Sequence, residues 1–122
     1  MARRVLLIED EPNIVEALSF LLTRDGWTVH AHGDGASALD RVRRDRPEVI
    51  VLDVMLPGRS GLDLLRDLRA DPATAAVPVL VLTARGQERD RDLALRLGAT
   101  AFLTKPFANA EVVAEVRRLG GG

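Results

Sequence analysis

Short apolar runs alternate with amphipathic segments five times along the chain. The five runs occupy residues 5–8, 27–31, 49–52, 77–82 and 100–103. Three of them, at 5–8, 49–52 and 77–82, are apolar throughout, which is typical of strands buried on both faces of a parallel sheet. In the run at 27–31 apolar and polar residues alternate, which also indicates a strand. The pattern therefore predicts five strands.

Each run is followed by a segment with helical periodicity. The predicted helices run from Pro12 to Gly26, from Asp34 past Val42, from Ser60 past Leu68, over 88–97 and over 109–119. Pro12 is a good first helical residue, while Asp34 and Ser60 suit the N-cap position of the second and third helices. Gly26 and Gly98 are natural helix terminators. Strands and helices thus alternate regularly from one end of the chain to the other.

Five strand–helix units, (βα)₅, favour one α/β domain with a parallel sheet covered by helices on both faces. Right-handed crossovers make a doubly wound, flavodoxin-like sheet with strand order 2-1-3-4-5 the expected topology. We expect residues 1–119 to form this domain and the glycines at 120–122 to be a tail or the start of a linker. In such sheets ligands bind outside the carboxyl ends of the strands, so residues at those ends are the candidates for function.

Composition excludes several classes of function. The net charge of −1 offers no electrostatic footprint for nucleic acid or an anionic membrane. The chain has no cysteine, hence no disulfide, thiolate metal site or cysteine nucleophile. It has no apolar stretch of membrane-span length and no signal-peptide pattern, so we expect a cytoplasmic protein.

Polar residues at the predicted strand ends carry the candidate chemistry. Glu9, Asp10 and Glu11 follow the first strand, Asp53 the third, Thr83 the fourth and Lys105 the fifth. Carboxylates brought together at one sheet edge raise one another's pKa unless a cation relieves them, and Mg²⁺ suits a site of few carboxylates. A carboxylate such as Asp53 can attack a phosphoryl group and become an aspartyl phosphate. A metal ion, an ammonium and a hydroxyl would then neutralise the phosphoryl oxygens.

Lysine usage singles out one of these residues. Of the 17 basic residues, Lys105 is the only lysine and the other sixteen are arginine. A chain that uses arginine wherever charge suffices indicates a special task for its lysine. A compact ammonium fits a tight pocket beside a carboxylate or a phosphoryl oxygen, where a planar guanidinium does not.

Four segments in this order resemble the receiver domain of two-component response regulators. They are Val5-Leu6-Leu7-Ile8-Glu9-Asp10-Glu11, Val51-Leu52-Asp53-Val54-Met55-Leu56-Pro57-Gly58, Val81-Leu82-Thr83-Ala84 and Lys105-Pro106-Phe107. The resemblance implies that Asp53 accepts a phosphoryl group from a histidine kinase, a phosphotransfer protein or a small phosphodonor. It implies Mg²⁺ on Glu9, Asp10, Asp53 and the backbone carbonyl of Met55. It also implies a signalling domain that catalyses only its own phosphorylation and dephosphorylation.

The same resemblance assigns roles around the phosphoacceptor. Thr83 and Phe102 would be the switch residues, and Lys105 would pair with the phosphoryl group, with Pro106 in a cis peptide bond. Met55 and Arg85 would tune the access of water, and a small Ala84 would leave room beside Thr83. Pro57 and Gly58 would set loop geometry. Output to an effector domain or partner would pass through the face formed by 88–97, 100–103 and 109–119.

Several readings stay open. Glu11 fits an acid favoured by a helix N-terminus, and His30 and His32 fit ordinary surface histidines. Thr100 and Ala101 stand where receivers of winged-helix regulators often carry two acids, so a homodimer through that face is not favoured. The rival functions are an aspartyl-phosphate hydrolase of the haloacid dehalogenase type and a flavodoxin-like nucleotide- or flavin-binding module. The first wants an aspartate where Met55 stands, and the second a phosphate-binding loop where the acids stand.

Overall fold

Five strands and five helices alternate along the chain in the computed structural model, which describes residues 3–83 and 88–121. The elements are β1 (Arg3–Ile8), α1 (Pro12–Arg24), β2 (Trp27–His32), α2 (Ala38–Asp45), β3 (Val49–Asp53), α3 (Gly61–Ala70), β4 (Val79–Thr83), α4 (Glu88–Leu97), β5 (Ala101–Thr104) and α5 (Asn109–Leu119). No helix in the described part of the chain is long and apolar enough to cross a membrane.

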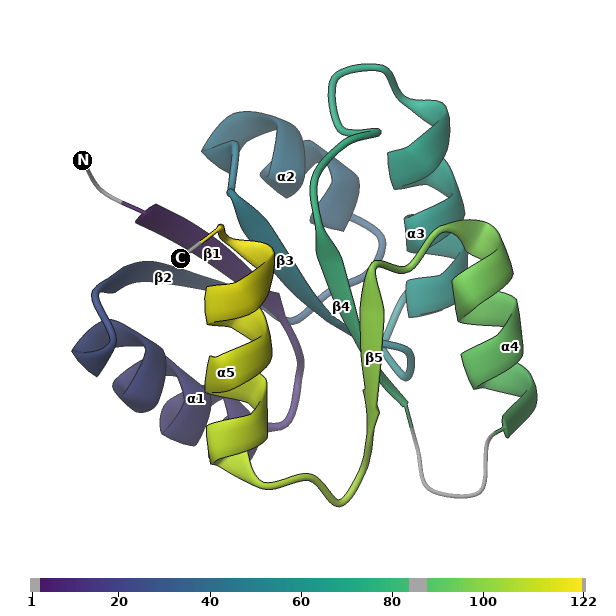
Figure 1. The fold of residues 1–122 in the computed structure, drawn as a ribbon. Helices are drawn as coiled ribbons and strands as arrows, with labels where there is room; N and C mark the ends of the chain where they lie inside the picture. The colour runs from purple at the N-terminus through teal and green to yellow at the C-terminus, as the bar shows by residue number, and fades with distance from the viewer. Residues whose placement is uncertain (1–2, 84–87, 122) are drawn as a thin grey trace.

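All strand pairs are parallel, and the sheet has the order β2-β1-β3-β4-β5. This confirms the predicted doubly wound topology. Helices α1 and α5 cover one face of the sheet, and α2, α3 and α4 cover the other (Figure 1). Because every strand runs in the same direction, the carboxyl ends of β1, β3, β4 and β5 meet at one edge of the molecule.

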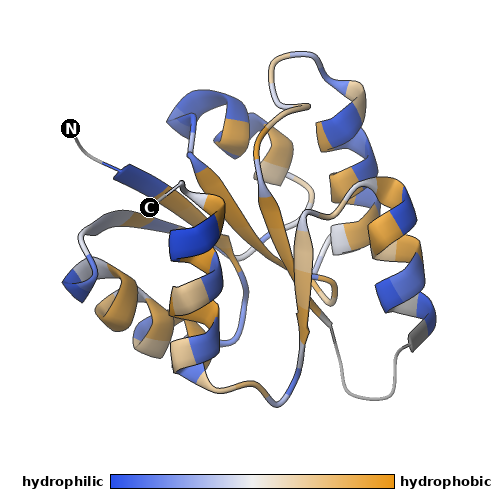
Figure 2. Ribbon diagram, in the orientation of Figure 1, coloured by the Kyte–Doolittle hydropathy of each residue, from blue (hydrophilic) through white to orange (hydrophobic). Residues whose placement is uncertain are grey.

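The alternation of side chains along each strand divides the core into two layers. One layer joins Leu6, Ile8, Ile50 and Leu52 to the inner faces of α2, α3 and α4. The other joins Val5, Leu7, Val49 and Val51 to α1 and α5. The central strands are therefore apolar, whereas hydrophilic and hydrophobic residues alternate along the helices (Figure 2).

Helix boundaries follow the predicted start and stop signals with one correction. Ser60 caps α3 by accepting a hydrogen bond from the backbone N–H of Leu62 at 3.2 Å. The prediction that Asp34 caps α2 is wrong, because the helix begins later and Ser37 occupies the N-cap. Asp34 instead accepts hydrogen bonds from the backbone N–H of Ala36 and the hydroxyl of Ser37, which shape the loop before the helix.

Candidate functional site

Three carboxylates meet where the two central strands β1 and β3 end. Glu9 directly follows β1, Asp10 comes next, and Asp53 is the last residue of β3. The strands are paired so that Ile8 lies beside Leu52, which brings the residues after them together. One carboxylate oxygen from each of Glu9, Asp10 and Asp53 lies within 4.8 Å of the others. Glu9 and Asp53 are buried, whereas Asp10 is exposed.

Glu9 is an unusual buried acid. Its Oε2 accepts hydrogen bonds from the backbone N–H groups of Asp10 at 3.0 Å and Glu11 at 3.2 Å. Its Oε1 is buried and accepts no hydrogen bond within the described part of the chain. Burial, followed by the hydrogen bond to Asp53, raises the pKa of Glu9 from 4.5 to about 7, although the Glu11 N–H and Lys105 act in the opposite direction. The site therefore favours either a proton or a cation at this carboxyl group.

Lys105 brings its ammonium to the same acids from the other side of β4. Its Nζ lies 3.3 Å from Asp53 Oδ2, 3.4 Å from Glu9 Oε1 and 3.4 Å from Glu11 Oε1. Burial acts to lower the pKa of Lys105, but the negative charges of Asp53, Glu9 and Glu11 outweigh it and raise the pKa. The Lys105–Pro106 peptide bond, which follows β5, is cis. The chain's one lysine is thus charged and placed against the acidic cluster.

Asp53 and the loop after it are closely packed. The Oδ1 atom of Asp53 accepts a hydrogen bond from the backbone N–H of Met55 at 3.2 Å, while the Met55 side chain is 68% exposed. Gly61 packs its Cα against the carbonyl of Asp53, and a Cβ there would lie 2.2 Å from that oxygen. Gly58 has φ +80°, a conformation that suits glycine. The carbonyl of Pro57 accepts a hydrogen bond from the N–H of Gly35, which joins this loop to the one before α2.

The predicted switch and tuning residues are described only in part. Thr83 ends β4 beside Thr104 of β5, and its side chain lies outside what the structure describes, as do Ala84 and Arg85 altogether. Phe102 is half-buried on β5 and packs against the core layer beneath α3 and α4. The guanidinium of Arg91, on α4, lies 4.5 Å from the centre of the Phe102 ring. Phe102 therefore sits between the sheet and the surface of α4.

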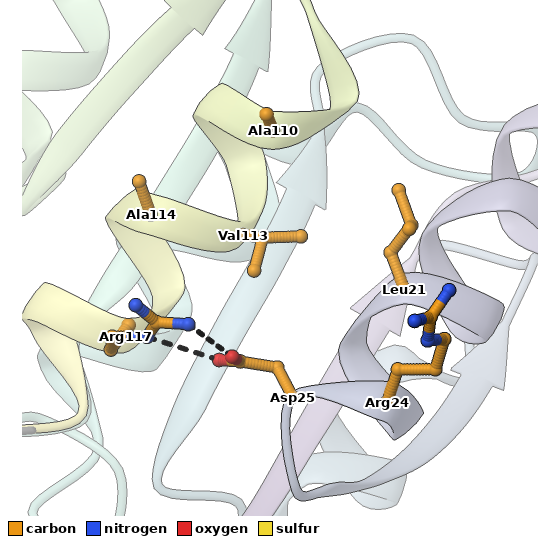
Figure 3. Close-up of a pocket in the computed structure, with 7 residues that line it drawn as sticks. All are labelled: Leu21, Arg24, Asp25, Ala110, Val113, Ala114 and Arg117. Carbon is orange, nitrogen blue, oxygen red and sulfur yellow. Dashed lines mark hydrogen bonds and ion pairs between the residues drawn. The ribbon is translucent and has the colours of Figure 1, made fainter.

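The two histidines of the chain have ordinary partners. His32 hydrogen-bonds to Ser37, and His30 contacts Arg41 and Asp45, so neither histidine shares a metal-type cluster within the described residues. A groove between α1 and α5 is lined by Leu21, Arg24, Asp25, Ala110, Val113, Ala114 and Arg117 (Figure 3). Asp25, the one acid among the described residues of the groove, already forms an ion pair with Arg117. Asp25 also lies at the end of α1 that is remote from Asp53. The groove offers no comparable chemistry.

Glu11 is the residue whose surroundings the sequence did not reveal. The pattern suggested an acid favoured by the N-terminus of α1. In the structure its side chain makes no capping hydrogen bond to that helix and lies against Lys105 instead. The two residues are 94 positions apart, and no local pattern encodes such a pairing. The only signal in the sequence was that Lys105 is the single lysine, which suggested that acidic groups lie near it.

The comparisons with known proteins agree with this geometry. The sequence profile described as the response regulator receiver domain matches residues 5–117, which is nearly the whole chain. The chain belongs to the response regulator receiver domain family. Receiver domains are the signalling domains of two-component systems, and the acidic cluster of Glu9, Asp10 and Asp53 fits a site for Mg²⁺ and an aspartyl phosphate. Membership in this family also excludes the two rival functions considered from the sequence, the aspartyl-phosphate hydrolase and the nucleotide- or flavin-binding module.

Individual relatives extend the comparison. The chain is 46% identical over 115 residues to TcrX of Mycobacterium tuberculosis, named as a probable transcriptional regulatory protein. That match covers 94% of this chain and 48% of TcrX, so the chain spans about half the length of that relative. The signal receiver domain of a histidine kinase from Syntrophus aciditrophicus is 32% identical, with a TM-score of 0.90 over 99% of this chain and 92% of its own.

Another similar receiver domain was solved with a bound metal ion. It belongs to the sensor histidine kinase PA1611 of Pseudomonas aeruginosa and has a magnesium ion coordinated in its active-site cleft. The two chains are 32% identical, with a TM-score of 0.85, and the match covers all of both. The likeness is to a domain with the same fold and with the metal that the acids of this chain suit.

Proposed function

We propose that Asp53 is the phosphoacceptor of this receiver domain. The observation that carries the proposal is a buried aspartate at a strand end, with the ammonium of Lys105 3.3 Å from its Oδ2 and two further acids beside it. An oxygen of Asp53 would attack the phosphorus of a phosphohistidine or of acetyl phosphate. A P–O bond to Asp53 forms as the bond to the donor's nitrogen or oxygen breaks, and the released imidazole takes up a proton. Hydrolysis of the aspartyl phosphate by water restores the carboxylate.

The residues present fit a magnesium ion. Four carboxylates and one ammonium gather here, which gives a formal charge of 1 − 4 = −3 when all are ionised. The buried Oε1 of Glu9 accepts no hydrogen bond from the described residues, and its carboxyl pKa is raised to about 7. Glu9, Asp10, Asp53 and the backbone carbonyl of Met55 would hold the ion. When bound, Mg²⁺ supplies positive charge for the oxygens of the transferring phosphoryl group.

Lys105, Thr83 and Phe102 would convert phosphorylation into a change of surface. Lys105 would pair with the phosphoryl group, and the Thr83 hydroxyl would move toward it. Phe102 would then turn inward, out of its position beneath Arg91. By the family resemblance, Met55 and Arg85 would tune the access of water and Ala84 would leave room beside Thr83, so that these residues would set how long the aspartyl phosphate lasts.

The proposed partners follow from the family. A histidine kinase or phosphotransfer protein would donate the phosphoryl group, and an effector domain or partner protein would read the face formed by α4, β5 and α5. We infer that the domain catalyses only its own phosphorylation and dephosphorylation, that residues 1–119 form the unit, and that 120–122 are a tail or the start of a linker. The cytoplasmic location stays a prediction of the sequence, and so does a homodimer, for which the sequence does not favour that face.

Phosphorylation in vitro tests the proposal. The protein is incubated with Mg²⁺ and acetyl phosphate, and its intact mass is measured over time. We expect a phosphoryl adduct that forms with Mg²⁺, does not form when chelator is present from the start, and is absent from the Asp53→Asn variant. No adduct on the wild type, or an equal adduct on Asp53→Asn, would refute the assignment.

A further inference from the structure

The side chain of Glu11 lies at the mouth of the phosphoacceptor site. Its Oε1 is 3.4 Å from the ammonium of Lys105, and the side chain is 58% exposed. Its backbone N–H donates to Oε2 of Glu9 at 3.2 Å, which fixes the position from which the side chain projects. Glu11 is therefore attached to the buried acid by its backbone and to the lysine by its side chain.

The N-terminus of α1 does not account for this position. Glu11 is the N-cap residue, and Pro12 follows it at the first helical position. An N-cap side chain normally accepts a hydrogen bond from the N–H groups of the first turn, and glutamate is not among the preferred N-cap residues. Glu11 makes no such bond. Its carboxylate is directed to Lys105 rather than to the helix.

Three carboxylates share one ammonium at nearly equal distances. Asp53 and Glu9 are buried, with Nζ of Lys105 at 3.3 Å and 3.4 Å, whereas Glu11 is exposed and equally near. Glu11 does not belong to the group of acids that could hold a metal together. A cation on that group would neutralise Glu9 and Asp53, so the attraction of Lys105 to Glu11 would gain in relative weight.

We propose that Glu11 is a positioning residue that holds Lys105 at the mouth of the site and competes with the phosphoryl group for its ammonium. The inference rests on the proposed role of Asp53. In the unphosphorylated protein Glu11 shares the lysine with Asp53. When Asp53 carries a phosphoryl group, the ammonium pairs with a phosphoryl oxygen and the contact with Glu11 is given up. Glu11 thus opposes the phosphorylated form of the switch.

Beryllofluoride binding at saturating Mg²⁺ tests the competition, with beryllofluoride standing for the phosphoryl group on Asp53. Glu11→Gln removes the ion pair with Lys105. Glu11→Asp keeps the negative charge, but its side chain is one methylene shorter, so the carboxylate lies farther from the Lys105 ammonium. We expect both variants to bind about two- to fivefold more tightly than the wild type, the effect of losing one exposed ion pair. Glu16→Gln, which removes an exposed charge from α1, is the matched control and should bind as the wild type does.

The lone lysine provides a direct readout. Protein labelled with nitrogen-15 only at the lysine side-chain nitrogen gives one signal in an NMR spectrum, from Nζ of Lys105. Without beryllofluoride, the Lys105 signal of both Glu11 variants should differ from that of the wild type. With beryllofluoride, the three signals should coincide, because the ammonium has then left Glu11.

The outcomes separate this inference from the proposed function. If the wild type fails to bind beryllofluoride, the role of Asp53 is refuted, and with it the competition. If the wild type binds and Glu11→Asp matches it, the charge acts through space and the positioning role is refuted. A tenfold loss of Mg²⁺ affinity in Glu11→Gln would make Glu11 a metal ligand and would also overturn the proposal.

Discussion

Replacing Glu9 with glutamine should remove most of the pH dependence of stability that the metal-free protein shows between pH 5 and pH 8. Glu9 is 1% exposed, and its Oε1 accepts no hydrogen bond from the described residues. In the folded protein its pKa is raised to about 7 by burial and by the hydrogen bond to Asp53. In the unfolded chain the same carboxyl group titrates near 4.5.

The sign follows from which state holds the proton more tightly. The folded protein keeps the Glu9 proton up to about pH 7, whereas the unfolded chain releases it near pH 4.5. The free energy of unfolding therefore falls as the pH rises from about 4.5 to 7. A difference of about 2.5 pKa units at about 1.4 kcal/mol each gives an upper value of about 3–4 kcal/mol. Because Glu9 and Asp53 interact closely and influence each other's protonation, a fall of about 1–3 kcal/mol is expected.

Other shifted groups titrate outside this window. The lowered pKa values of Asp25, Asp45 and Asp71 make their contributions fade only as the pH falls through those values, below the ordinary 3.8. The raised pKa of Lys105 makes its contribution fade only above pH 10.5. Among the groups with a resolved shift, Glu9 is therefore the one that titrates between pH 5 and pH 8.

Urea unfolding in the presence of a chelator measures the effect. Trp27 is a suitable probe of global unfolding, because it is 3% exposed at the start of β2, roughly 17 Å along that strand from its carboxyl end. Wild type and Glu16→Gln should lose stability from pH 5 to pH 8, and Glu9→Gln should stay nearly level. Saturating Mg²⁺ should abolish most of the loss in the wild type. Equal pH slopes in wild type and Glu9→Gln would refute the reasoning.

Two further substitutions test the lysine and a structural arginine. Lys105→Arg should still be phosphorylated at Asp53 but bind beryllofluoride roughly tenfold more weakly, because a planar fork cannot replace a compact ammonium; unchanged binding and amide shifts would contradict this. Arg69 donates to the carbonyls of Ala75, Val77 and Gly98 at 2.7–3.0 Å. Arg69→Met should therefore lower the free energy of unfolding by about 2–3 kcal/mol, and a loss below about 1 kcal/mol in urea unfolding would show that water replaces the guanidinium.

The fold was predictable because its determinants are local. The bounds of α4 and α5 agree with the periodicity, and each helix is followed directly by a glycine, Gly98 or Gly120. The strands agree less closely: β1, β4 and β5 differ from the prediction by one or two residues at their starts, and every strand but β1 extends one residue further at its end. β1 includes the polar Arg3 and Arg4 because they pair with Trp27 and Thr28 of β2. A strand begins where its residues find pairing partners in a neighbouring strand, and the pattern of apolar and polar residues carries no information on these partners.

The locations of Asp53, Glu9, Asp10 and Lys105 were predictable for a topological reason. Parallel strands place their carboxyl ends at one edge, so residues that follow buried runs meet there whatever their separation in the chain. The direction in which a side chain points could not be predicted in this way. The contact of Glu11 with Lys105 depends on a pairing across 94 positions. The carbonyl contacts of Arg69 were equally hidden, because one arginine among sixteen gives no signal.

The geometry around Lys105 explains why a chain so rich in arginine has a lysine here. Oxygens of Asp53, Glu9 and Glu11 lie 3.3–3.4 Å from one nitrogen atom. An ammonium has three rotatable donors at a single point, and it can turn toward oxygens that approach from different elements. A guanidinium spreads its donors over a plane and matches two oxygens of one group instead. Convergence on a point, more than charge alone, distinguishes Lys105 from the sixteen arginines.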